Sequence, residues 1–63
     1  MDLLTTAQVS ALTGLSPATL RYWRHANEGP ASFRLGKRVL YRREAVERWI
    51  EAQEKATTRG GLA

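Results

Sequence analysis

The sequence contains no cysteine, a single histidine and no apolar run long enough to cross a membrane. Without cysteine there is neither a disulfide framework nor a thiolate zinc site, and one histidine cannot form a histidine cluster. The N-terminal segment lacks the basic and apolar regions of a secretory signal peptide. We therefore expect a cytoplasmic protein, neither secreted nor membrane-spanning, whose fold depends on packing alone.

The 63 residues are enough for one small domain. A domain of this size buries only about 60% of the surface that its unfolded chain exposes, so most apolar residues are needed for the core and a deep substrate cleft is not expected. The glutamates at 44, 47, 51 and 54 follow helical spacing with no histidine, cysteine or aspartate near them, which argues against a metal site or a catalytic carboxylate pair. The sequence predicts a protein that is not an enzyme and has no cofactor.

Positive charge is concentrated in the middle of the chain. Ten Lys and Arg outnumber six Asp and Glu, which gives a net charge of +4. Residues 21–43 hold seven Lys or Arg and one Glu, a net +6, whereas residues 44–55 hold four Glu and two Lys or Arg, a net −2. A basic segment of this kind is typical of a surface that binds nucleic acid, although a basic face can also be merely solvated.

The first predicted helix covers about residues 6–12. Thr5 and Gln8 have the spacing of a capping box at its start. Leu4 and Val9 have the spacing of a hydrophobic staple, which fixes the angle at which the chain enters the helix. Along the helix, Val9 and Leu12 are expected to face inward.

A second helix is predicted after a short turn. Gly14 ends the first helix, because glycine enters left-handed backbone geometry without a steric penalty. Ser16 is the expected N-cap of the second helix, with proline next to it at the first helical position. Leu20 and Trp23 face inward, and the Asn, Gly and Pro within residues 27–30 end the helix near residue 26. Two helices joined by a glycine-containing turn predict a helix-turn-helix.

A β-hairpin is predicted next, with two short strands that turn about residues 36–38. Phe33 and Leu35 are expected to lie opposite Val39 and Tyr41 on one face. The predicted fold class is therefore mainly α with a small two-stranded antiparallel β-hairpin wing, in the order helix-turn-helix, hairpin and C-terminal helix.

The last helix is predicted over about residues 44–55, with Val46, Trp49 and Ile50 on one apolar stripe. Trp49 and Trp23 are aromatic and could stack on bases, but their spacing with other apolar residues favours the core. We expect residues 1–56 to form the folded domain and residues 57–63 to form a flexible tail.

The helix-turn-helix predicts a DNA-binding site. A major groove about 12 Å wide admits one α-helix, whose N-terminal residues reach the base edges. Thr19 and Arg21 are the candidate base contacts, because an arginine fork bonds guanine O6 and N7 and a threonine can donate to a base or touch a thymine methyl group. The other candidates point wholly or partly outward on the same helix, several of them toward phosphates: Ser16, Ala18, Tyr22, Arg24 and His25.

The hairpin supplies a second set of candidate DNA contacts. Lys37 and Arg38 project from a narrow tip that can enter or flank the minor groove, with Arg34 on the strand before it. Arg42 and Arg43, at the base of the last helix, can clamp the adjoining phosphates. Such a tip can also be only a soluble turn.

Two segments of the chain resemble a known family. The sequences TTAQVSALTGLSPATLRYW and GKRVLYRREAVERWI look like the small winged helix-turn-helix domains of phage excisionases and their MerR-like relatives, over about residues 4–51. In the MerR pattern an Arg-Tyr pair lies on the DNA side, and here it would be Arg21 and Tyr22. The resemblance implies a recognition helix in the major groove, a wing in the minor groove and no catalysis.

For an excisionase, the resemblance further implies side-by-side, cooperative binding of several copies to double-stranded DNA, DNA bending, and partnership with a phage integrase, which is a tyrosine recombinase, inside the bacterial host cell. Full MerR regulators carry a dimerisation helix and an effector domain, whereas this chain ends about a dozen residues past Trp49. We therefore expect no small-molecule ligand and favour an excisionase, that is, a recombination directionality factor.

Other interpretations stay open at this point. Leu40 stands where such domains often carry an arginine, so it either packs in the strand or adds a protein contact. A small MerR-like transcriptional regulator is the first alternative function, and a protein-interaction module with a basic face is the second. The excisionase predicts an array of direct repeats, the regulator an isolated or palindromic site, and the interaction module no affinity for DNA at physiological salt.

Overall fold

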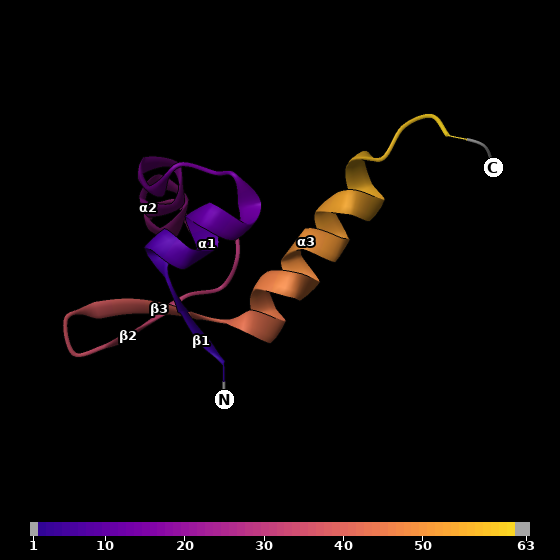
Figure 1. The fold of residues 1–63 in the computed structure, drawn as a ribbon. Helices are drawn as coiled ribbons and strands as arrows, with labels where there is room; N and C mark the ends of the chain where they lie inside the picture. The colour runs from indigo at the N-terminus through magenta and orange to yellow at the C-terminus, as the bar shows by residue number, and fades with distance from the viewer. Residues whose placement is uncertain (1, 62–63) are drawn as a thin grey trace.

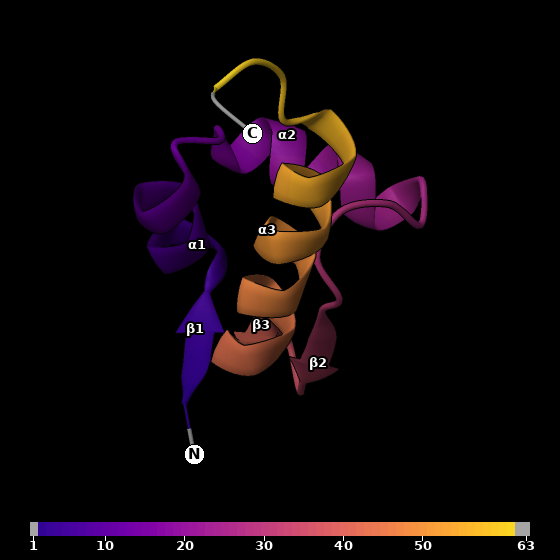
Figure 2. The ribbon, with the colours of Figure 1, turned by 90° about the vertical axis from the view of Figure 1, so that its right-hand side faces the viewer.

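The computed structural model describes residues 2–61 and contains three helices and a small antiparallel sheet. The elements follow in the order β1 (Leu3–Thr5), α1 (Thr6–Thr13), α2 (Pro17–His25), β2 (Phe33–Leu35), β3 (Arg38–Arg42) and α3 (Arg43–Thr57). Helices α1 and α2 lie together on one side of the sheet, while α3 leaves the end of β3 and runs out past the body (Figures 1 and 2). The predicted order of helix-turn-helix, hairpin and last helix is confirmed.

Helix α1 begins with the predicted capping box. The Thr5 hydroxyl accepts a hydrogen bond from the Gln8 amide at 3.1 Å, and the Gln8 side chain accepts one from the Thr5 amide at 2.8 Å. Val9 is fully buried, as predicted, but Leu12 is 51% exposed and its predicted inward position is wrong. Leu12 lies at the edge of α1 that faces α3 across an open groove, so no element covers it.

Helix α2 has the start and end that its sequence predicts. Ser16 is its N-cap, and the chain leaves the helix through Asn27, which adopts a left-handed conformation at φ 61. The amide of Glu28 donates to the carbonyl of Trp23 at 2.7 Å, and the amide of Asn27 donates to that of Arg24 at 3.4 Å. These two bonds form a Schellman motif, which satisfies carbonyls that the helix end would otherwise leave without a partner.

The sheet has three strands in the order β1-β3-β2, so the predicted two-stranded sheet is incomplete. Strand β1 pairs antiparallel with β3, with Leu4 opposite Tyr41. The pairing continues past the strand ends, where the Arg43 amide donates to the Asp2 carbonyl at 3.0 Å. A strand of three residues is too short to show the alternation by which strands are predicted from sequence.

The β2–β3 hairpin differs from the prediction by one residue in register. Its turn contains Gly36 and Lys37 alone, where the sequence predicts a turn of three residues. Gly36 has φ 62, which suits the first central position of a type II′ turn. Side chains alternate between the two faces of a sheet, so the shift places Phe33 opposite Leu40 instead of Tyr41. The predicted shared face of Phe33, Leu35, Val39 and Tyr41 is therefore wrong.

The core takes one buried residue from each of five elements. It consists of Leu4 from β1, Val9 from α1, Leu20 from α2, Tyr41 from β3 and Val46 from α3. Leu15 and Val39 pack against this cluster. The shared core holds α2 at a defined angle to the hairpin.

Leu40 is buried on the other face of the sheet. It is 6% exposed and lies between Phe33 on one neighbouring strand and Thr5 on the other. The interpretation that Leu40 packs within the sheet is confirmed, and an exposed protein contact at this residue is wrong.

Helix α3 is longer than its predicted range and ends at Thr57, one residue past the predicted domain boundary. Residues 58–61 are exposed and form neither helix nor strand. The flexibility of the tail stays a prediction; its residues 62–63 lie outside the described residues, as does Met1 of the predicted domain. No helix within residues 2–61 is long and apolar enough to cross a membrane.

Candidate nucleic-acid interface

The outward face of α2 is polar and cationic. Leu20 turns into the core, whereas Arg21, Tyr22 and His25 are exposed, with Tyr22 at 67%. Arg24, in the last turn, is partly buried. Arg24 and His25, the basic residues of the last turn, lie near the negative end of the helix dipole, which favours positive charge there.

The first turn of α2 offers one free amide to an anion. Pro17 has no amide hydrogen, and the Thr19 amide donates to the Ser16 hydroxyl at 3.1 Å. The Leu20 amide donates to the Ser16 carbonyl at 3.1 Å. The Ala18 amide is therefore the group that this helix end presents to a phosphate.

Ser16 and Thr19 are bonded to each other as well as to the backbone. The Ser16 hydroxyl donates to the Thr19 hydroxyl at 2.9 Å, and Thr19 is partly buried. The Thr19 hydroxyl accepts this bond, so its own hydrogen can still be donated outward. The capping interaction thus fixes the orientation of the candidate base contact.

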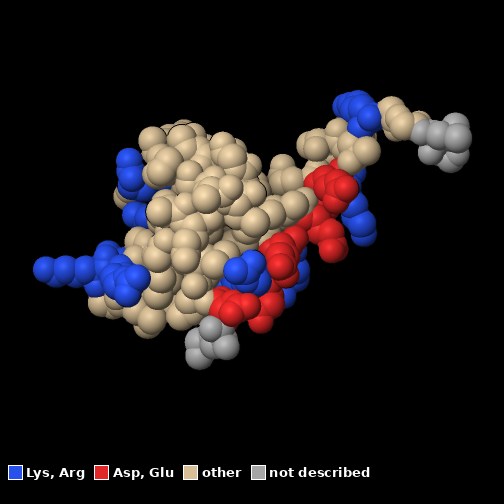
Figure 3. Space-filling model, in the orientation of Figure 1, with Lys and Arg blue, Asp and Glu red and all other residues tan. Residues whose placement is uncertain are grey.

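The hairpin carries exposed cations at its tip and along its first strand. Arg34, Lys37 and Arg38 are all exposed, and Lys37 occupies the turn itself. Figure 3 shows positive charge over α2 and the hairpin at one end of the molecule and negative charge along α3. The two predicted groups of DNA contacts are therefore brought to the same end of the fold.

The two predicted clamp residues have different surroundings. Arg42 is exposed, and its guanidinium carbon lies 5.8 Å from the centre of the Phe33 ring, which holds the side chain against the sheet. Arg43 is partly buried, and its Nε lies 3.3 Å from a carboxylate oxygen of Asp2. The sequence does not predict the ion pair between Arg43 and Asp2, because the pair depends on the β1–β3 pairing, which the sequence does not predict either.

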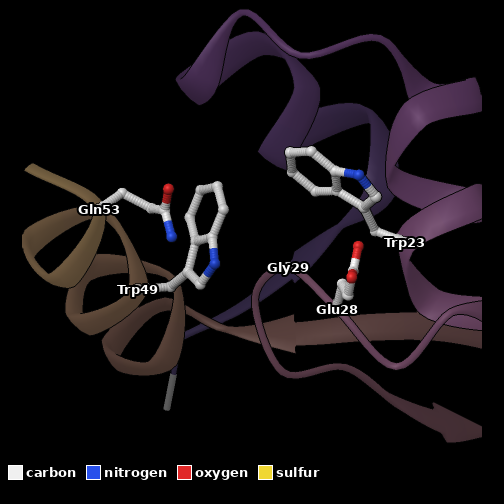
Figure 4. Close-up of a pocket in the computed structure, with 5 residues that line it drawn as sticks. All are labelled: Trp23, Glu28, Gly29, Trp49 and Gln53. Carbon is white, nitrogen blue, oxygen red and sulfur yellow. The ribbon is translucent and has the colours of Figure 1, made fainter. Parts of the chain in front are cut away.

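Behind the outward face of α2, two indole rings connect this helix to α3. The ring centres of Trp23 and Trp49 are 5.7 Å apart with a tilt of 56°, and Figure 4 shows both rings at a cleft of about 350 Å³ that Glu28, Gly29 and Gln53 also line. Both indoles are partly buried and pack on each other, but they lie outside the buried core, so their predicted place in the core is wrong.

The model of a helix-turn-helix domain family matches residues 3–54, most of the chain. The chain belongs to this helix-turn-helix domain family. The family includes excisionase-like small DNA-binding domains, and its members are typically not enzymes. The protein is thus a helix-turn-helix DNA-binding domain. No curated protein and no solved structure gave a significant match.

The helix-turn-helix domain shows no arrangement that suggests a different chemistry in its described part. Within residues 2–61 no three His, Asp or Glu side chains come together in a way that could hold a metal ion. The acidic residues of α3 follow one another along the helix and face solvent. The features that bear on function are the cationic side chains of α2 and the hairpin.

Proposed function

We propose that the domain binds duplex DNA with α2 in the major groove and with the β2–β3 hairpin as a wing against the minor groove. The observation that carries the proposal is the placement of exposed cations from both elements at one end of the fold, away from the acidic α3 (Figure 3). A shared core fixes the angle between the two elements, so they can engage neighbouring grooves together.

In this arrangement α2 supplies the sequence-specific contacts. Arg21, in the second turn and fully outward, bonds guanine O6 and N7. Thr19 donates its hydroxyl hydrogen to a base or touches a thymine methyl group. The remaining groups of the helix bind phosphates or the groove wall: Ser16, the Ala18 amide, Tyr22, Arg24 and His25.

The wing and the clamp supply affinity with little sequence preference. Arg34, Lys37 and Arg38 neutralise phosphates along the minor groove, and Arg42 binds the backbone beside them. Arg43 contributes less than Arg42, since its guanidinium is already bonded to Asp2.

We propose further that the domain is an excisionase, a recombination directionality factor. Copies bind side by side on repeated sites, bend the DNA and direct a phage integrase toward excision of the prophage. Support comes from the resemblance of TGLSPATLRYW and of the Gly-basic-basic hairpin to excisionases, and from a family that includes excisionase-like domains.

Selection of binding sites from random DNA tests both levels of the proposal. Footprinting, stoichiometry and bend analysis on a long selected fragment then follow. Evenly spaced direct repeats, an extended cooperative footprint and bent DNA are the outcome expected for an excisionase. A single short site on straight DNA would point to a small transcriptional regulator, and a failure to enrich any sequence would refute the DNA-reading role of α2.

A further inference from the structure

An apolar groove lies between the α1–α2 turn and helix α3, outside the candidate DNA contacts. Leu12 and Leu15 line one wall and Trp49 and Ile50 the other, around a volume of about 330 Å³. Leu12 is 51% exposed and Ile50 is 37% exposed, so the groove is open to solvent. Leu12 and Ile50 are thus apolar side chains that their own chain leaves largely uncovered.

The groove is open because α3 diverges from the body. Figures 1 and 2 show the helix running past the α1–α2 turn without closing on it. Every residue from 50 to 61 is exposed, so the second half of α3 packs on little of its own chain. Exposed apolar side chains that gather in one place, in contrast to scattered ones, mark an interaction surface.

Three carboxylates flank Ile50 on the exposed surface of α3, beside the groove and outside the residues that line it. Glu47 and Glu54 precede and follow Ile50 by three and four residues, so they are its neighbours on the helix surface, and Glu51 adjoins it. Figure 3 shows negative charge along α3, with basic side chains beside and beyond it. An apolar floor beside a row of carboxylates repels nucleic acid and is complementary to apolar side chains flanked by Lys or Arg.

We propose that this groove binds a basic amphipathic segment of a protein partner, with the partner's apolar side chains against Leu12 and Ile50 and its cations against the carboxylates of α3. None of the residues that line the groove is a candidate DNA contact. The domain can therefore hold a basic protein segment without using those contacts. This proposal extends beyond the DNA contacts and does not require them.

Defined peptides test the proposal on the whole protein. One synthetic helical peptide carries leucines on one face and lysines on the other, and a second replaces the lysines with glutamates. Binding is followed by fluorescence anisotropy of labelled peptide, and the site is mapped by chemical-shift changes of the protein amides. We expect the lysine peptide to bind and shift residues around Leu12, Trp49 and Ile50, and the glutamate peptide not to bind.

Variants locate the site. Ile50→Ser should weaken the lysine peptide about tenfold or more, because the side chain is covered by the partner. Leu12→Ser provides the same test from the opposite wall and serves if Ile50→Ser does not fold. The matched control is Leu35→Ser in the hairpin, because Leu35 is about as exposed as Leu12. This variant should bind the lysine peptide with unchanged affinity.

Charge variants distinguish the carboxylates beside Ile50 from acidic side chains elsewhere on the protein. Glu47→Gln should weaken the lysine peptide about two- to fivefold, as expected for one exposed ion pair, whereas Glu28→Gln, beside the other cleft, should have no effect. Ile50→Ser should leave DNA binding unchanged, so a failure of the DNA proposal is recognised separately.

Three results would overturn the inference. Equal binding of both peptides, or no binding of either, would show that the carboxylates of α3 do not select a basic segment. Insensitivity of binding to both Ile50→Ser and Leu12→Ser would place the peptide elsewhere. Self-association of the free protein that Ile50→Ser abolishes would identify a second copy as the occupant, in place of a basic partner.

Discussion

The contact between Gly29 and Trp23 provides a sharp test of how α2 is held. Gly29 has φ 76, and a Cβ at this position would lie 2.8 Å from Cε3 and 3.3 Å from Cβ of Trp23. Trp23 in turn packs on Trp49 of α3. Gly29→Ala therefore forces either the backbone or the indole to move, and the movement passes to the junction between the two helices.

Two effects add in Gly29→Ala. A left-handed conformation costs an alanine about 1–2 kcal/mol, and overpacking against a ring that is held on both sides costs about 1–3 kcal/mol, which gives about 2–5 kcal/mol. A core in a domain of fewer than about 70–80 residues rarely supplies more than about 3–5 kcal/mol. We therefore expect the free energy of unfolding of the variant to be close to zero at 25 °C.

Gly36→Ala is the matched control. Gly36 has φ 62, but a Cβ there would have no heavy atom within 4 Å, so only the backbone cost of about 1–2 kcal/mol applies. Both substitutions remove the same freedom from the unfolded chain, so this contribution cancels in the comparison. The excess loss in Gly29→Ala measures the contact with Trp23.

Urea unfolding, followed by far-UV circular dichroism and tryptophan fluorescence, gives the free energies of unfolding of the two variants. The excess should shrink when both glycine substitutions are repeated in a Trp23→Leu background, where Trp49 still reports unfolding. Equal losses for Gly29→Ala and Gly36→Ala, or an excess that survives Trp23→Leu, would refute the reasoning.

Three further predictions concern the DNA contacts and the helix start. Arg21→Ala should weaken binding to the preferred site by about 1–3 kcal/mol and relax the preference at one base position, as measured by competition with single-base variants of the site; an unchanged preference would contradict a base contact. Lys37→Ala should weaken all sequences alike and lower the slope of log affinity against log salt by about one unit; a loss restricted to one sequence would show that the wing reads bases. Ser16→Ala should lower the free energy of unfolding by about 1 kcal/mol, because the Thr19 amide loses its hydrogen bond to the Ser16 hydroxyl. Ser16→Gly should lower it by only a few tenths of a kcal/mol. Thermal unfolding distinguishes the two variants, and equal losses would contradict the capping role.

Local signals predicted most of the helical structure. The Thr5–Gln8 capping box and the Ser16 cap act within four residues, and both occur in the structure where the sequence places them. The same holds for the end of α2, where Asn27 takes the left-handed position. Such interactions depend on neighbours in the chain, so a single sequence contains the information that they need.

Features that depend on distant partners were less predictable. Strand β1 has three residues and exists because β3 lies beside it. The hairpin register depends on whether its turn has two residues or three, and GKR permits both readings. A shift of one residue exchanges the two faces of the strand, which is why Leu40 is buried opposite Phe33 while Leu35 stays exposed.

The candidate site also contains some features that the local sequence predicts and others that depend on distant residues. Exposure of Arg21 and Tyr22 follows from helical periodicity once Leu20 and Trp23 are assigned to the inside. The pairing of Arg43 with Asp2 does not follow from any local pattern, since the two residues meet only through the sheet. The contacts of all these residues with DNA stay predictions.

The core of five residues, each from a different element, makes folding all-or-none. No pair of neighbouring elements holds more than two of the five buried side chains, so a partly folded chain gains little from apolar burial before α3 arrives with Val46. Helix α2 is therefore not stable on its own, and slow hydrogen exchange should appear in all five elements at one common free energy, that of global unfolding. A destabilising change in α3, far from any phosphate, would lower the fraction of molecules able to bind DNA without altering the sequence that they prefer.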